Sequence, residues 1–298
     1  MERIVKGIVA AMVTPLNSDE SLNEAEIANQ VNKKIAAGVD GVFCLGTNGE
    51  GYIMNEDEKY RIISAFVKAA DGRVPVYAGT GQPGTADTIR LSRKAKELGA
   101  DVLSVVSPYF AAISQKEISD HYAELAASVD LPIVLYNMPA RTGNNIAPET
   151  VAKLSAIPNI VGVKDSSGNF DNMKQYIELT DPETFSVLSG NDALILWNLL
   201  AGGAGGITAI ANIYPETMVS IYRYFIAGDL DAAKIAQDSI RPLRNCFKFG
   251  NPNTVTKMAA NIAGNPVGPC RRPFSYLSED AVRSIEATVK ADFERGLK

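Results

Sequence analysis

The chain has little histidine and cysteine, and each shortage excludes a kind of active site. His121 is the single histidine among 298 residues, so neither a histidine-rich metal site nor a Ser-His-Asp triad is expected. It lies in the helical pattern HYAELAAS, which favours a surface or helix-packing role. The three cysteines, Cys44, Cys246 and Cys270, are far apart and form no C-x-x-C pair. We therefore expect reduced thiols, with neither a disulfide framework nor a thiolate metal site.

The chain also lacks a basic segment and a long apolar run. Its 29 basic and 34 acidic residues give a net charge of -5, and no lysine- or arginine-rich run predicts nucleic-acid binding. The apolar stretch before Pro15 spans about eight residues, too few for a membrane span or a signal peptide. With 46% apolar and 21% charged residues, the composition indicates a globular protein with a sizeable core. We expect a cytoplasmic protein that acts on a small molecule.

Eight short, apolar, β-branched runs recur along the chain. They are GIVAAMV at 7, GVFCLG at 41, VPVYAG at 74, VLSVV at 102, PIVLYN at 132, IVGVK at 160, FSVLSG at 185 and GGITAI at 205. Segments with helical periodicity lie between them, and several, such as NEAEIANQVNKKIAAG, end at glycine. This alternation predicts parallel strands joined by crossover helices.

Eight strand-helix units predict a closed (β/α)8 TIM barrel, which we place at residues 1–229. An open doubly wound sheet usually has fewer strands and a glycine fingerprint after the first strand, whereas here the first strand leads into MVTPL. Residues 230–298 contain further helical segments and no convincing strand. We therefore predict a C-terminal helical extension, 230–298, packed on the barrel.

Two polar residues close neighbouring strands at the carboxyl end, where barrel active sites lie. Lys164 ends the run IVGVK, and poor solvation there would disfavour its ammonium form and leave free amine for Schiff-base formation. A salt bridge with Asp165, or a lysine that extends to solvent, is an equally open interpretation. Tyr136 ends the preceding strand, so its phenol can approach the amine and move protons. Taken alone, Tyr136 is more typical of a packed tyrosine before a turn.

Other candidate groups follow the strand ends. The segment GTNGEG at 46–51 offers backbone amides, the Thr47 hydroxyl and the Asn48 amide, which together can hold a carboxylate or phosphate. Ordinary turn chemistry is the commoner explanation of such a segment. Arg141 in PARTG can grip a second anionic group, or it is a surface arginine. The eighth run contains Thr208.

Taken together, GTNGEG, YNMPARTG and GVKDSSGN resemble the dihydrodipicolinate synthase and N-acetylneuraminate lyase family. The resemblance runs from AAMVTPLN at 10–17 through VSPYF at 106–110 to LSGNDAL at 188–194 and GGITAIAN at 205–212. It thus covers nearly the whole chain. It implies a class I aldolase or lyase that uses no metal or organic cofactor and is usually a homotetramer, a dimer of dimers.

The resemblance also assigns roles to residues of this chain. Lys164 forms an imine with pyruvate, Tyr136 shuttles protons, and Thr47 acts beside them as a catalytic residue. The hydroxyl and amides of Thr47 and Asn48 hold the pyruvate carboxylate. The other groups expected to line the site are Arg141, Gly190 and the carbonyl of Ile207. The imine draws electrons from C3, so one intermediate serves both formation and cleavage of a carbon-carbon bond.

Departures from the family pattern leave the aldehyde partner open. Asn48 stands where threonine is usual, and Phe110 stands where the synthases carry a tyrosine donated across the dimer into a proton relay. Phenylalanine cannot pass a proton, which favours a 2-keto-3-deoxy sugar acid aldolase. Arg141 matches the arginine that binds the carboxylate of aspartate semialdehyde, which favours a 4-hydroxy-tetrahydrodipicolinate synthase. Ala193 lacks the acidic group of the sialic acid lyases, so N-acetylneuraminate is a less expected substrate.

Two other classes of function are compatible with a barrel. A non-catalytic barrel that binds a 2-oxo acid would bind pyruvate without turnover, and Phe110 favours it. The joint presence of Lys164, Tyr136 and Thr47 favours an enzyme. A phosphate-binding isomerase requires a glycine-rich phosphate loop after the seventh and eighth strands, and SGND and TAIAN are poor matches.

Overall fold

The computed structural model describes residues 5–298, and its eight parallel strands form a closed barrel in chain order. The strands are β1 (Gly7–Ala11), β2 (Gly41–Cys44), β3 (Val76–Gly79), β4 (Val102–Val106), β5 (Ile133–Asn137), β6 (Ile160–Asp165), β7 (Ser186–Ser189) and β8 (Gly205–Thr208). Each strand overlaps one of the eight apolar runs. The TIM barrel predicted from the sequence is therefore confirmed.

The segments between and after the strands are helical. The α-helices are α1 (Glu24–Ala37), α2 (Glu56–Ala70), α3 (Thr85–Glu97), α4 (Gln115–Ser128), α5 (Pro139–Thr142), α6 (Pro148–Ser155), α7 (Phe170–Leu179), α8 (Ile195–Leu200), α9 (Pro215–Ile226), α10 (Leu230–Ser239), α11 (Arg241–Asn245), α12 (Pro252–Ile262) and α13 (Glu279–Glu294). Short 3-10 helices are η1 (Asp192–Leu194), η2 (Ile210–Asn212) and η3 (Cys246–Phe249). The predicted C-terminal helical extension is confirmed, and its boundary at residue 229 stays a prediction. In the described part of the chain, no helix has the length and apolar character that a membrane crossing requires.

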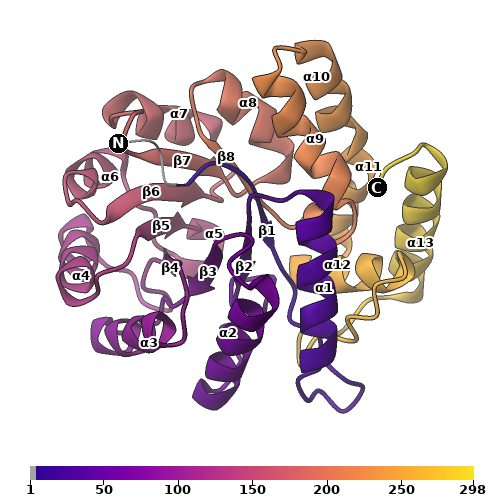
Figure 1. The fold of residues 1–298 in the computed structure, drawn as a ribbon, viewed down its shortest axis with the longest axis horizontal. Coiled ribbons are helices and arrows are strands. Elements are labelled where there is room, and N and C mark those ends of the chain that lie inside the picture. The colour runs from indigo at the N-terminus through magenta and orange to yellow at the C-terminus, as the bar shows by residue number, and fades with distance from the viewer. Residues whose placement is uncertain (1–4) are drawn as a thin grey trace. The chain divides into compact units, whose positions relative to one another are not determined.

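The described residues fall into two compact units. The first contains residues 5–7 and Tyr77–Ile207, and in Figure 1 its helices α3, α4, α6 and α7 lie outside strands β4 to β7. Every residue of β5 and of β6 is buried, as expected for parallel strands covered on both faces. The second unit contains Ile8–Val76 and Thr208–Lys298, and therefore α1, α2 and α9 to α13.

Within the first unit, the start of the chain's first strand runs along the last two strands. The Gly7 amide donates to the Ala204 carbonyl at 2.9 Å, and the Ser186 hydroxyl donates to the Val5 carbonyl at 2.5 Å. Gly205 adopts a φ of 147°, and a Cβ there would lie 2.0 Å from the Gly7 carbonyl oxygen. Position 205 therefore requires glycine, because any side chain would force these two backbones apart.

Within the second unit, a buried polar cluster joins α1 to η2. The Asn212 side chain accepts from the Val13 amide at 3.0 Å and donates to the Ala11 carbonyl at 2.9 Å. Buried Lys34 donates from Nζ to the Asn212 carbonyl at 3.0 Å and to Gln30 Oε1 at 3.2 Å. Desolvation lowers the pKa of Lys34 to about 8. The β1 end and the segment after β8 are thus held together by side-chain bonds to backbone groups.

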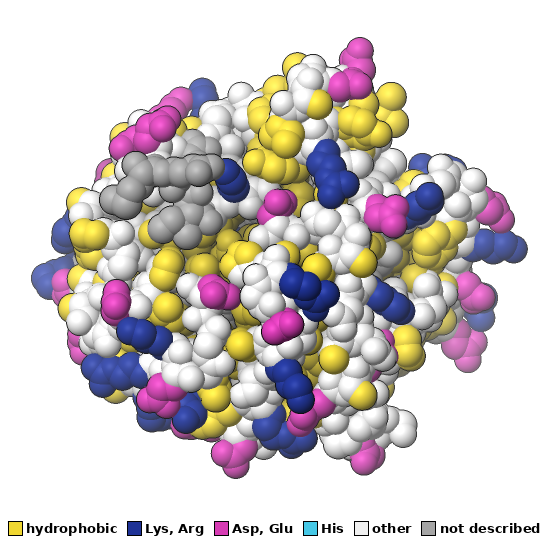
Figure 2. Space-filling model, in the orientation of Figure 1, with side chains coloured by type: hydrophobic (Ala, Val, Ile, Leu, Met, Phe, Trp, Pro, Cys, Tyr) yellow, Lys and Arg dark blue, Asp and Glu magenta, His cyan; other side chains and the backbone are white. Residues whose placement is uncertain are grey.

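Surface charges are mixed. On the face shown in Figure 2, the basic and acidic side chains of the described residues are interspersed rather than gathered by sign. Among the described residues, several charged side chains form pairs one helical turn apart, such as Lys116 with Asp120 and Lys174 with Glu178. Exposed pairs of this kind add little stability, because water and salt screen them, so the core and its buried polar groups carry the stability.

The single histidine packs between helices of the first unit. His121 on α4 is buried, and its Nδ1 lies 2.9 Å from the Thr85 hydroxyl at the start of α3. Burial lowers the pKa of His121 from 6.5 to about 4. The helix-packing role predicted for this residue matches its position. A buried neutral imidazole must take up a proton on unfolding whenever the pH lies between these two pKa values.

We predict that His121 makes the protein acid-sensitive. Because its pKa is lower in the folded chain, its contribution is complete above pH 6.5 and is lost as the pH falls toward 4. The full loss is up to about 3 kcal/mol. His121→Gln keeps an acceptor for Thr85 but does not titrate. Urea unfolding between pH 7 and 4.5 should show a smaller loss of stability in the variant, and equal losses would contradict the prediction.

Candidate active site

Lys164 and Tyr136 are direct neighbours on adjacent strands of the first unit. Parallel pairing of β5 with β6 sets Tyr136 opposite Lys164 in the register. Both side chains are buried, Lys164 with 3% of its surface exposed. The Lys164 Nζ lies 4.0 Å from the centroid of the Tyr136 ring. The amine therefore sits in poorly solvated surroundings beside a phenol, as the strand-end pattern predicts.

The Tyr136 hydroxyl has a partner on the loop after its own strand. It donates to the Met138 sulfur at 2.9 Å. The amine thus lies over the face of the ring, while the hydroxyl is directed toward Met138. A phenol placed in this way can exchange a proton with a group bound next to the amine once its weak bond to sulfur is given up.

Gly190 packs directly against the lysine. Its amide donates to the Asp165 carbonyl at 2.7 Å, just after β7 ends. A Cβ at position 190 would lie 2.9 Å from the Lys164 Cε and 2.0 Å from the Ser166 Oγ. Because glycine has no Cβ, position 190 leaves room for the Lys164 side chain. The structure thus brings Lys164, Tyr136 and Gly190 together, and Ile207 lies buried on β8 in the same unit.

Asn137 and Asp165, which follow Tyr136 and Lys164 on their strands, belong to a hydrogen-bonded network on the other face of the two strands. The Asn137 Nδ2 donates to Asp165 Oδ1 at 2.9 Å, and the Ser167 hydroxyl donates to Asp165 Oδ2 at 2.7 Å. Burial raises the pKa of Asp165, and the bonds from Ser167 and Asn137 oppose this effect. The Asp165 carboxylate is therefore engaged on the opposite side of the strand from Lys164, which disfavours the salt bridge weighed as an alternative.

The same network anchors the loop that carries Arg141. Asn137 Nδ2 also donates to Asn145 Oδ1 at 2.9 Å, and its Oδ1 accepts from the Ile146 amide at 3.0 Å. Tyr176 on α7 donates to the Ile146 carbonyl. The sequence interpretation missed this role of Asn137. Its position in the sequence could have revealed this role. Asn137 comes one residue after Tyr136, and successive side chains of a strand point to opposite faces.

Arg141 is exposed on the short helix α5, and its loop is tied to the segment after β4. The Asn144 Nδ2 donates to the carbonyls of Pro108 and Ala111 at 2.9 and 2.8 Å. Between them, Phe110 adopts a φ of 85° and leaves 99% of its side chain exposed. Asn144 therefore fixes the backbone on both sides of this exposed aromatic residue relative to the Arg141 loop.

Thr47 and Asn48 lie in the second unit, on the loop 46–51 that follows β2. The loop closes on itself, because the Glu50 amide donates to the Thr47 carbonyl at 3.1 Å and the Gly51 amide to the Gly46 carbonyl at 3.3 Å. Both residues are partly exposed. The Thr14 hydroxyl donates to the Gly49 carbonyl at 2.6 Å. The backbone of this loop is thus fixed, while Thr47 and Asn48 stay accessible to a ligand.

Two further candidates can be placed. Thr208 is buried at the end of β8, and its hydroxyl accepts from the Ala211 amide at 3.4 Å, which fits a role in the turn. The three cysteines are buried free thiols. Among the described residues, no group of His, Cys, Asp and Glu side chains is arranged to hold a metal ion.

Comparison with known proteins gives consistent likenesses. The Dihydrodipicolinate synthetase family model matches residues 4–292. A 4-hydroxy-tetrahydrodipicolinate synthase of Methanoculleus marisnigri is 40% identical, over 92% of this chain and 94% of its own. The dihydrodipicolinate synthase of Thermotoga maritima superposes with a TM-score of 0.93 at 33% identity, covering 97% of this chain and 99% of its own. YagE, an E. coli K12 prophage protein of the dihydrodipicolinic acid synthase family solved with pyruvate, has a TM-score of 0.93 at 30% identity, with coverages of 97% and 99%.

Proposed function

Because the chain belongs to the dihydrodipicolinate synthetase family and is a class I, Schiff-base-forming aldolase or lyase, we propose that it condenses pyruvate with aspartate semialdehyde through an imine on Lys164. The observation that carries this proposal is the buried Lys164 amine, 4.0 Å from the Tyr136 ring centroid. The synthase name of a relative that is 40% identical supports the choice of aldehyde.

The chemistry needs only groups that this chain supplies. The free Lys164 amine attacks the C2 carbonyl of pyruvate, water leaves, and a protonated imine forms. The imine withdraws electrons, so C3 loses a proton to give an enamine, whose C3 attacks the aldehyde carbon. Tyr136 is the proposed proton shuttle, and Thr47 is a second proposed catalytic residue. Hydrolysis of the product imine returns the amine, and no metal or organic cofactor takes part.

The remaining contacts are proposed from the family resemblance and the local geometry. The fixed loop 46–51 presents the Thr47 hydroxyl and amides of Thr47 and Asn48 to the pyruvate carboxylate. Gly190 and the carbonyl of Ile207 line the space beside the lysine. Exposed Arg141 grips the carboxylate of aspartate semialdehyde.

We predict that borohydride traps pyruvate on Lys164 and on no other buried lysine. Lys34 is the sharpest control, because it is buried and desolvation lowers its pKa to about 8. After incubation with pyruvate and borohydride, peptide mass analysis should find the N-(1-carboxyethyl) adduct at Lys164. The adduct should vanish in Lys164→Ala and persist in Lys34→Met. Labelling at Lys34, or at no lysine, would refute the proposed mechanism.

The second candidate is an aldolase for 2-keto-3-deoxy sugar acids. Phe110 favours it, because its ring cannot supply the phenolic proton of the synthase relay. The two candidates differ in the charge of the aldehyde, since aspartate semialdehyde carries a carboxylate and the sugar aldehyde does not. The role of Arg141 therefore separates them.

We predict that Arg141→Ala lowers kcat/KM for aspartate semialdehyde by about 10- to 100-fold, the usual effect of losing a charge-assisted hydrogen bond. Turnover of an uncharged sugar aldehyde should change less than about twofold, since such an aldehyde offers no carboxylate to a guanidinium. Arg141→Lys keeps the charge and should lose less than Arg141→Ala. Equal effects on both aldehydes, or turnover of the sugar aldehyde alone, would favour the second candidate. Pyruvate binding without turnover of either would favour a non-catalytic 2-oxo-acid-binding barrel.

We further propose that the protein is a cytoplasmic homotetramer, a dimer of dimers. Free, buried cysteines suit a reducing compartment. Phe110 is 99% exposed on a backbone fixed by Asn144, and such a large exposed aromatic is typical of an interface. Light scattering should give four times the chain mass, and Phe110→Asp should lower it. A monomeric wild type would contradict the proposal.

A further inference from the structure

The loop 46–51 is held in a strained conformation. Leu45, just before the loop, and Glu50, near its end, adopt left-handed backbone angles with φ of 59° and 56°. Neither is a glycine, so each conformation costs free energy that other contacts must offset. A Cβ at Gly51 would lie 2.2 Å from the Leu45 carbonyl oxygen. The loop therefore folds tightly back on the end of β2, and something must hold it there.

The side chain of Glu50 anchors this loop to the C-terminal extension. It is fully buried, with 0% of its surface exposed, and its Oε1 forms an ion pair with Lys257 Nζ at 2.6 Å. Lys257 lies on α12, is 1% exposed and also donates to the Pro269 carbonyl at 2.7 Å. The other carboxylate oxygen of Glu50 accepts from the Arg271 amide at 2.8 Å. Lys257, Pro269 and Arg271 all belong to the extension, residues 230–298.

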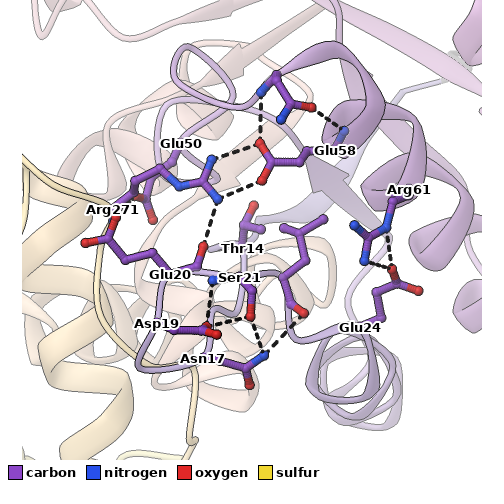
Figure 3. A network of polar contacts seen from close by, with 12 residues as sticks. Thr14, Asn17, Asp19, Glu20, Ser21, Glu24, Glu50, Glu58, Arg61 and Arg271 are labelled. Atoms are coloured by element: carbon purple, nitrogen blue, oxygen red, sulfur yellow. Dashed lines mark hydrogen bonds and ion pairs between the residues drawn. The ribbon is translucent and has the colours of Figure 1, made fainter.

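The segment that carries Arg271 is itself tied to elements on either side of the loop in sequence. The Arg271 guanidinium donates to both carboxylate oxygens of Glu58 at 2.8 Å and to the Glu20 carbonyl at 2.8 Å (Figure 3). Glu58 also closes the capping box at the start of α2. These bonds hold the segment around Arg271 in place. Glu50 accepts its hydrogen bond from the backbone amide of this segment.

We propose that Glu50 and Lys257 are positioning residues that fix the loop 46–51 for recognition of the substrate carboxylate. The inference rests on the proposed function, in which Thr47 and Asn48 of this loop bind the pyruvate carboxylate. Glu50 acts through the backbone of the loop, since its amide is bonded to the Thr47 carbonyl. The extension thereby becomes part of the substrate-binding apparatus.

The test compares two carbonyl compounds that can each form an imine with Lys164. Pyruvate carries the carboxylate that the loop is proposed to bind, and acetaldehyde does not. For each compound, the concentration that gives half-maximal borohydride trapping at Lys164 is measured by peptide mass analysis. A variant that misplaces the loop should weaken trapping of pyruvate alone, whereas general damage to the barrel should weaken both.

In Glu50→Gln, the half-saturating pyruvate concentration should rise about tenfold, and that of acetaldehyde should change less than about twofold. Glu50→Gln leaves the Lys257 charge buried without its partner, and this unpaired charge destabilises the fold by itself. The double variant Glu50→Gln, Lys257→Met removes both charges and avoids this cost. It should show the same loss that is confined to pyruvate.

Asp292→Asn is the matched control in the same extension. Asp292 on α13 is fully buried, accepts from the Tyr214 hydroxyl at 3.1 Å and pairs with Arg295, far along the chain from the loop. This variant should lower the thermal midpoint and leave trapping of both compounds unchanged. It therefore separates a loss of stability from a loss of carboxylate recognition.

The outcomes are distinct. A rise for pyruvate alone in both Glu50 variants supports the inference. Unchanged pyruvate trapping, equal rises for the two compounds, or the same rise in Asp292→Asn overturns it while the proposed function stands. Absence of any Lys164 adduct with pyruvate in the wild type overturns the proposed function and the inference with it.

Discussion

The pairing of β5 with β6 determines the arrangement of the proposed reactive groups in the first unit. Its register sets Tyr136 beside Lys164 and Asn137 beside Asp165. Because side chains alternate along a strand, one pair is the proposed reacting pair and the other is the hydrogen-bonded support behind it. A slip of one residue would exchange these faces. A slip of β6, for example, would place the Asp165 carboxylate beside Tyr136, where the amine is required.

In the second unit, side-chain hydrogen bonds rather than strand pairing position the proposed ligand groups. Its proposed ligand groups, Thr47 and Asn48, lie on a loop rather than at paired strand positions, so no sheet register fixes them. Buried polar side chains take over this task. Thr14 bonds the Gly49 carbonyl, and Glu50 is bonded to Lys257 and to the Arg271 amide. A loop that follows a left-handed Leu45 and contains a left-handed Glu50 needs such directional bonds, because apolar packing alone does not select one backbone path.

The strands, the helices and the buried position of Lys164 at a strand end could be predicted because their signals are local. Apolar runs, helical periodicity and glycine ends each depend on residues close in the chain, and Lys164 could be recognised because it interrupts an apolar run at its end. The bond between Glu50 and the Arg271 amide spans 221 residues, and no local pattern pairs those two positions. The direction of the Tyr136 hydroxyl, toward Met138, depends on side-chain packing that periodicity does not encode.

The energetics of ion pairs explain why the Glu50–Lys257 pair points to function rather than to stability alone. Exposed pairs such as Lys116 with Asp120 contribute little. A buried pair is also a poor source of net stability, since well-packed apolar residues in its place are often as stable or more so. Losing one partner, however, costs about 3–5 kcal/mol. An interaction with a small net benefit and a large penalty for any change tolerates only one arrangement of its two partners. That property suits a contact whose purpose is to hold the loop 46–51 in one place.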